Sequence, residues 1–154
     1  MKKTVLFLCT ANYYRSRYSE LLFNHYAAVH RLPWQADSRG ILAEQYNNPG
    51  PIYPVVIDRL QQMGIPVEAD LRYPRQLNEQ DLERADCTIA LKKAEHLHMM
   101  QQLFPGWSDR ITYWHIHDID VALPEEALPK IDIEINKLVE NLLTGGQTPC
   151  GIVD

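Results

Sequence analysis

The chain has 154 residues, of which 45% are hydrophobic and 23% charged, with a net charge of -5. This length allows one well-buried core and is too short for two ordinary domains, so we expect a single domain over residues 1–154. The acidic balance argues against a nucleic-acid partner, because proteins that bind polyanions usually carry a basic face. No apolar run approaches the roughly 20 residues that span a bilayer, so we expect no membrane partner.

The chain contains three cysteines, Cys9, Cys87 and Cys150, which stand far apart in the sequence. An odd number of distant cysteines without a secretion signal does not indicate a disulfide scaffold, so we expect a cytoplasmic protein. No pair has metal-ligand spacing, and the histidines at positions 96, 98, 115 and 117 lack thiols at zinc-site spacing. We expect surface or packing roles for these histidines and no bound metal.

The first predicted element is a buried strand at 5–8, where the apolar run is continuous. Apolar residues then recur at helical spacing up to about His30, so this strand leads through a short polar loop into a helix. A second strand is expected at 34–39 and is ended by Gly40. A helix follows at 54–63, beginning at Pro54 and closed by Gly64.

The second half of the chain continues this alternation. Residues 66–77 show no clean period and are expected to form a surface connection, after which Asn78 caps a short helix through Arg84. Strands are expected at 87–91 and 111–116, with a helix at 94–104 between them. A final helix is expected over about 125–143, with Pro129 as an alternative start, followed by a tail at 144–154 without clear periodicity.

Alternating strands and helices predict an α/β fold, built as a doubly wound three-layer sandwich. In such a fold the functional crevice lies at the carboxyl ends of the strands. Cys9 stands at such an end, which directs attention to the residues that follow it.

A candidate anion site lies where the first strand turns into the first helix, in the string Cys9-Thr-Ala-Asn-Tyr-Tyr-Arg15-Ser16. The backbone N–H groups of this loop can point inward and bind a tetrahedral dianion at the helix N-terminus. The guanidinium of Arg15 can bind two phosphate oxygens at once. We therefore predict a phosphate cup formed by Thr10, Ala11, Asn12, Tyr13, Tyr14, Arg15 and Ser16.

Cys9 is the predicted nucleophile of this cup. The loop amides and the positive end of the helix favour its thiolate form, and Ser16 can donate its hydroxyl to that thiolate. An alternative interpretation makes Cys9 a buried strand residue and Arg15 a solvated helix residue. The strand before, the helix after and the serine next to Arg15 favour the functional interpretation.

These residues resemble the low-molecular-weight protein tyrosine phosphatase family. The likeness extends over most of the chain and includes Val5 to Cys9, Asn12, Arg15-Ser16, Glu20, Ser38-Arg-Gly40, residues 81–86, Trp114 and Asp118. The resemblance implies a four-stranded parallel sheet flanked by helices, and hydrolysis through a phosphocysteine intermediate without metal or other cofactor. It also implies that Asn12, Ser16 and Ser38 hold the loop in its shape.

The chain departs from the family pattern at three places. Ala11 stands where the family commonly has Gly, and Tyr14 replaces a second Cys, so the disulfide that eukaryotic members form beside the nucleophile cannot form. The general acid of the family is an Asp followed by Pro, whereas this chain has His117-Asp-Ile-Asp120. Alignment on Trp114 favours Asp118 over Asp120 as the acid.

Together these features predict a phosphate monoester hydrolase, and in particular a protein tyrosine phosphatase. Its catalytic residues would be Cys9, Arg15 and Asp118, and its slot walls Tyr13, Tyr14 and Tyr46. The expected substrate is a phosphotyrosine-containing protein or a small aryl phosphate, and the product is inorganic phosphate.

Three alternative functions stay open at this point. Thioredoxin-coupled arsenate reductases share the loop but need two further cysteines close together in the later half, where this chain has Cys87 and, in the tail, Cys150. A phosphocysteine carrier of the sugar-transport type would not require Arg15-Ser16 or a general acid. A non-catalytic phosphate-binding module would have lost its acid.

Overall fold

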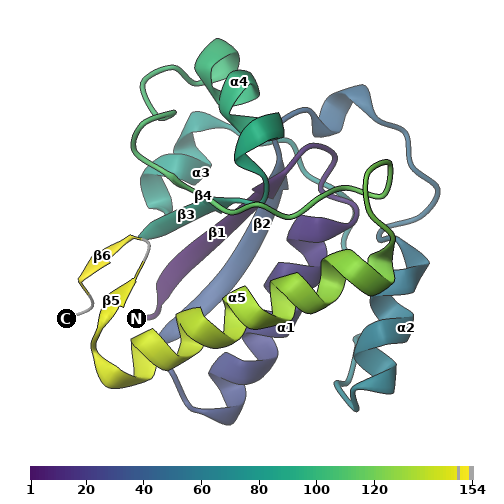
Figure 1. Cartoon of the computed structure of the whole chain (residues 1–154), viewed down its shortest axis with the longest axis vertical. Helices are drawn as coiled ribbons and strands as arrows, with labels where there is room; N and C mark the ends of the chain where they lie inside the picture. The colour runs from purple at the N-terminus through teal and green to yellow at the C-terminus, as the bar shows by residue number, and fades with distance from the viewer. Residues whose placement is uncertain (149, 153–154) are drawn as a thin grey trace.

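A computed structural model describes residues 1–148 and 150–152, and a parallel sheet runs through its centre (Figure 1). The four strands lie in the order β2-β1-β3-β4, and every pairing between neighbours is parallel. Their bounds are Lys3–Cys9 for β1, Trp34–Gly40 for β2, Cys87–Ala90 for β3 and Thr112–Tyr113 for β4. The predicted fold class is confirmed.

Helices cover both faces of the sheet, because side chains alternate along the central strand β1. Val5 and Phe7 belong to a large hydrophobic cluster with α1 (Arg15–Val29), α2 (Pro54–Gln62) and α5 (Pro124–Thr144). Leu6 and Leu8 belong to a smaller cluster with α3 (Glu79–Arg84) and α4 (Lys93–Leu103). A short 3₁₀ helix, η1, spans Ala43–Gln45 beyond β2.

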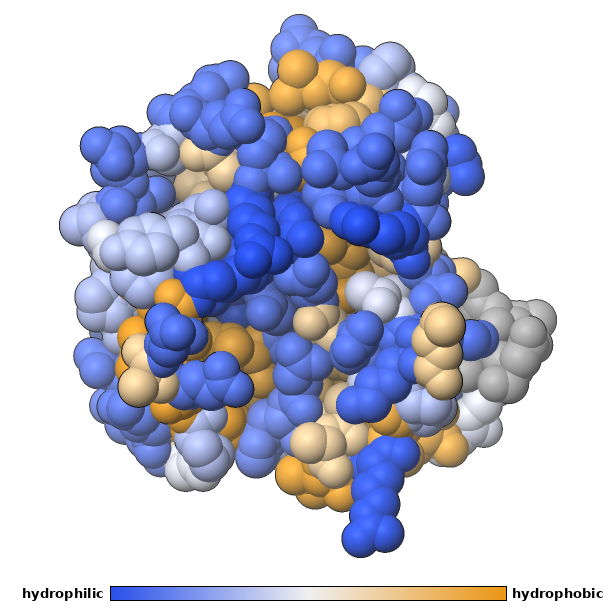
Figure 2. Space-filling view, turned by 180° about the vertical axis from the view of Figure 1, so that it is seen from behind, coloured by the Kyte–Doolittle hydropathy of each residue, from blue (hydrophilic) through white to orange (hydrophobic). Residues whose placement is uncertain are grey.

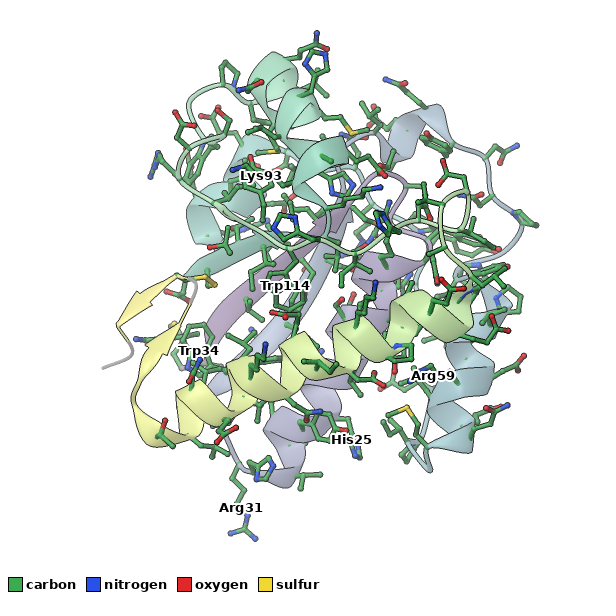
Figure 3. The ribbon with its side chains drawn as sticks, viewed as in Figure 1. His25, Arg31, Trp34, Arg59, Lys93 and Trp114 are labelled. Atoms are coloured by element: carbon green, nitrogen blue, oxygen red, sulfur yellow. A yellow bond between two sulfur atoms is a disulfide. The ribbon has the colours of Figure 1, made fainter. Side chains whose placement is uncertain are left out.

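Local signals place several helix ends where the sequence predicts them. α2 begins at Pro54, where a missing N–H costs no helical hydrogen bond. Asn78 caps α3 through a reciprocal pair of hydrogen bonds with Asp81. Arg59 of α2 lies against α5 (Figure 3) and pairs there with Asp132, which ties the two helices together.

The structure corrects two predicted boundaries. The strand predicted at 111–116 has a regular ladder only at Thr112–Tyr113, because the chain then forms an isolated antiparallel bridge between Lys92 and His115. Pro129 does not start the last helix: α5 begins at Pro124 and runs through Pro129. Pro124 is tolerated because the first N–H groups of a helix have no helical partner. Pro129 lies inside the helix, where it removes the i→i−4 hydrogen bond to the carbonyl oxygen of Glu125, and α5 continues through it.

The tail contains a two-stranded antiparallel hairpin, formed by β5 (Gln147–Thr148) and β6 (Gly151–Ile152). The structure joins Cys150 to Cys87 in a disulfide, with Cα atoms 5.3 Å apart. This distance is ordinary for a disulfide. The spacing of the cysteines did not indicate this disulfide, because only the hairpin returns the tail to the start of β3.

Seen from behind, polar residues cover most of the molecule and hydrophobic residues appear as separate patches (Figure 2). Among the described residues, no helix has the length and hydrophobicity needed to cross a membrane.

Candidate active site

The loop between β1 and α1 borders a cavity of about 240 Å³. Gly40 allows β2 to approach this loop, since a Cβ at that position would lie 2.8 Å from the carbonyl oxygen of Thr10. The cavity is lined by Cys9, Ala11, Tyr13, Tyr14, Arg15, Tyr46, Asn48, Tyr53, Asp118 and Ile119. The predicted nucleophile, arginine and acid therefore meet in one cavity.

The sulfur of Cys9 has a hydroxyl partner in the buried base of the cup. Cys9 Sγ lies 2.9 Å from Ser16 Oγ. Ser16 Oγ accepts a hydrogen bond from Asn12 Nδ2 at 2.8 Å, which leaves the serine hydrogen free to point at the sulfur. The serine hydroxyl is therefore placed to donate to the sulfur of Cys9.

Asn12 holds the loop in its shape with every polar atom of its side chain. Its backbone is left-handed, with φ at 57°, a region that Asn tolerates better than most residues. Besides its bond to Ser16, Nδ2 donates to Ser38 Oγ at 2.8 Å. Its Oδ1 accepts from Arg72 Nη1 at 3.1 Å and from the backbone N–H of Arg75 at 3.0 Å.

Arg72 belongs to the connection at 66–77 and supports the loop from outside. Its Nη2 donates to the carbonyl oxygen of Ser38 at 2.9 Å and pairs with Glu20 at 3.1 Å and Asp37 at 3.3 Å. Burial raises the pKa of Glu20, although Arg72 opposes the effect. A segment that the sequence predicts as a surface connection thus provides a cation that supports the loop from outside the cavity.

Arg15 is buried, and both terminal nitrogens of its guanidinium already have partners. Nη1 donates to the carbonyl oxygen of Ile116 at 3.0 Å, and Nη2 lies 2.8 Å from Glu95 Oε2 and 3.3 Å from Asp118 Oδ2. The Nε–H has no hydrogen-bond partner among the described residues. One buried donor of the arginine is therefore left for a ligand of the cavity.

Glu95 and His96 hold one side of the cup from the start of α4. Glu95 accepts hydrogen bonds from the Thr10 hydroxyl and from Arg15. Burial alone would raise the pKa of Glu95, but bonds with His96 and Arg15 hold it well below its usual range. Burial lowers the pKa of His96, whose Nδ1 accepts from the Lys92 N–H, so the neutral ring carries its proton on Nε2, 2.9 Å from Glu95.

The two candidate acids lie in different surroundings. Asp118 lines the cavity and reaches Arg15, while its Oδ1 accepts from the Ile119 N–H at 2.9 Å. Asp120 is exposed and does not line the cavity. The geometry therefore brings Asp118, and not Asp120, to the predicted nucleophile.

Aromatic rings form one wall of the cavity. Tyr13, Tyr14 and Tyr46 line it as the sequence predicts, and Tyr53 from the start of α2 joins them. The ring of Tyr53 lies 5.9 Å from that of Tyr13 and 5.3 Å from that of Tyr14. A wall of this kind can accept a flat, apolar group next to an anion bound in the cup.

Sequence reasoning missed Glu95, His96, Arg72 and Tyr53. A signal existed for the first two, since polar residues that closely follow a parallel strand often reach the carboxyl edge of the sheet. For Arg72 and Tyr53 no local signal exists. Among the described residues, no group of three or more His, Cys, Asp or Glu side chains could hold a metal ion.

Solved structures share this fold over almost the whole chain. YfkJ from Bacillus subtilis matches with a TM-score of 0.79 and 24% identity, over 96% of this chain and 98% of its own. The low molecular weight protein tyrosine phosphatase from T. tengcongensis matches with a TM-score of 0.72 and 25% identity, over 93% and 99%. The YwlE arginine phosphatase from Geobacillus stearothermophilus matches with a TM-score of 0.73 and 22% identity, over 92% and 94%.

Comparison with curated protein sequences finds no match. A family model, in contrast, matches residues 4–143, which include the cup, Glu95 and Asp118. This chain belongs to the low molecular weight phosphotyrosine protein phosphatase family.

Proposed function

We propose that this protein hydrolyses aryl phosphate monoesters, phosphotyrosine in particular, through a phosphocysteine at Cys9. The observation that carries the proposal is the buried Nε–H of Arg15, a residue that lines the same cavity as Cys9, because this donor lacks a partner among the described residues. A phosphoryl oxygen would satisfy this donor. The aromatic wall beside it suits the ring of a tyrosyl group.

In the first step the Cys9 thiolate attacks phosphorus and the bond to the aryl oxygen breaks. Asp118, protonated and released from its pairing with Arg15, gives its proton to that oxygen, so the product departs as a neutral phenol and Asp118 is left as a carboxylate. In the second step Asp118 takes a proton from water, whose oxygen attacks phosphorus and releases the Cys9 thiolate with inorganic phosphate. Arg15 and the loop amides balance the phosphoryl charge in both steps.

The geometry disfavours each alternative function. An arsenate reductase would pass a disulfide from Cys9 to a second cysteine, but Cys87 pairs with Val5 in the sheet. Val5 lies four residues before Cys9, which is roughly 13 Å along the strand. A carrier or a non-catalytic module needs no acid, whereas Asp118 lies 3.3 Å from Arg15.

The test is turnover of para-nitrophenyl phosphate, a phosphotyrosine peptide and a phosphoarginine peptide by the purified chain. We expect the first two to be hydrolysed and Cys9→Ser to lose turnover while it still binds inorganic phosphate, because the cup is built from backbone and Arg15. Turnover retained in Cys9→Ser would exclude the thiolate mechanism. A preference for the phosphoarginine peptide would overturn the tyrosine assignment.

A further inference from the structure

Tyr14 combines deep burial with an unsatisfied hydroxyl. It is the last residue before α1 and is 6% exposed, and its ring meets Tyr53 edge to face, with an angle of 82° between the ring planes. Its hydroxyl oxygen is buried and has no hydrogen-bond partner among the described residues. A buried hydroxyl without a partner has lost its bonds to water and destabilises the folded state.

Three other tyrosine hydroxyls of the chain do have hydrogen-bond partners. The hydroxyl of Tyr18 donates to Asp132, and that of Tyr113 donates to the carbonyl oxygen of Ser108 at 2.8 Å. The hydroxyl of Tyr13, next to Tyr14, donates to the carbonyl oxygen of Pro49. Among the described residues, Tyr14 is the one tyrosine whose buried hydroxyl lacks a partner, and this hydroxyl requires an explanation of its own.

The charged groups that act on Tyr14 are Asp118 and Arg15 of the cavity and Glu125 at the start of α5. Tyr14 lines the same cavity as Cys9, Arg15 and Asp118. Burial raises the pKa of Tyr14 to about 12, and the Asp118 carboxylate adds to the effect while Arg15 opposes it. The hydroxyl therefore keeps its proton at neutral pH and is available as a donor.

Two buried donors without partners thus come from neighbouring residues of one cavity, the O–H of Tyr14 and the Nε–H of Arg15. A single oxyanion, which offers several acceptor oxygens, would satisfy both of them. An apolar or cationic ligand would satisfy neither.

We propose that the Tyr14 hydroxyl donates a hydrogen bond to the phosphoryl group in the cup and is a catalytic residue beside the loop amides and Arg15. The inference rests on the proposed function, since it takes the ligand of the cup to be a phosphoryl group. It gives Tyr14, which replaces the second cysteine common in the family, a chemical role in this chain.

Tyr14→Phe tests this role, because it removes the hydroxyl and keeps the ring against Tyr53. Titration of the full chain with inorganic phosphate should show an affinity weaker by roughly 10- to 150-fold, the usual worth of a hydrogen bond to a charged group. Without phosphate, the thermal midpoint of Tyr14→Phe should equal or exceed that of the wild type, because the lost hydroxyl had no partner in the protein.

Tyr113→Phe is the matched control, since Tyr113 lies outside the cavity and its hydroxyl is bonded. It should lower the thermal midpoint and leave phosphate affinity unchanged. Equal phosphate affinity in wild type and Tyr14→Phe would overturn the donor role and leave the proposed phosphatase intact. A lower midpoint of phosphate-free Tyr14→Phe would also overturn it, and a wild type that binds no phosphate would overturn both proposals.

Discussion

The carboxylate of Glu95 lies 2.8 Å from the guanidinium of Arg15, although the two residues are 80 positions apart in the chain. The same oxygen accepts from the hydroxyl of Thr10, the residue after Cys9. One carboxylate of α4 therefore contacts both ends of the cup. This contact makes Glu95 a positioning residue for Arg15 in the proposed reaction.

Glu95→Gln should lower kcat by roughly 10- to 100-fold, because small displacements of a positioned group have effects of this size. Its inhibition constant for inorganic phosphate should not rise, since the change removes a negative charge from beside the anion. Steady-state kinetics with a phosphotyrosine peptide and phosphate as inhibitor measure both quantities. The exposed Glu126 supplies the control, and Glu126→Gln should match the wild type in both. Weaker phosphate inhibition in Glu95→Gln would contradict the positioning role.

Asp118→Asn should slow phosphotyrosine hydrolysis by roughly 10²- to 10⁴-fold, the usual worth of a positioned acid. The loss should shrink for aryl phosphates with better leaving groups, because a nitrophenolate needs less protonation than a tyrosyl oxygen. Asp120→Asn is the paired variant and should show neither effect, since Asp120 is exposed outside the cavity. Rates across several aryl phosphates decide the assignment, and a leaving-group effect confined to Asp120→Asn would transfer the role.

His96 should make the protein less stable in mild acid. Burial lowers the pKa of His96, whereas an unfolded histidine titrates near pH 6.5. The unfolded chain therefore binds a proton that the folded chain does not, so the free energy of unfolding falls as pH drops below about 6.5. The slope contributed by one proton is at most about 1.4 kcal/mol per pH unit.

Urea unfolding between pH 7.5 and 5.5 measures this slope. His96→Gln should flatten it, whereas His98→Gln, on an exposed position of the same helix, should keep it. An unchanged slope in His96→Gln would show that other groups cause the acid sensitivity.

Cys150→Ser should leave turnover intact and lower the free energy of unfolding. The disulfide with Cys87 closes a sequence separation of 63 residues, for which chain entropy gives about 4 kcal/mol. Turnover is spared because Cys87 lies at the start of β3 and Cys9 at the end of β1. Thiol titration of the denatured, non-reduced wild type should find one free thiol, Cys9, and three free thiols would contradict the disulfide.

Thioredoxin-dependent arsenate reduction by the wild type that is lost in Cys150→Ser would favour the reductase alternative.

Local sequence was enough to predict the framework of the fold and the centre of the site. The apolar run before Cys9, the helical spacing after Arg15 and Pro54 at a helix start each express a preference of a few neighbouring residues. Cys9 and Arg15 could be paired in advance because both lie in one short loop. Their proximity follows from covalent connection alone.

Only the tertiary structure placed Glu95 and Arg72 around that loop, and only it joined Cys87 to Cys150. These contacts connect segments separated by tens of residues, and they depend on the order of strands in the sheet and on the path of each connection. The preferences of neighbouring residues do not determine that path. The same reason explains the short β4, because the chain beyond Tyr113 follows its contacts with Leu91 and Lys93 rather than its own strand propensity.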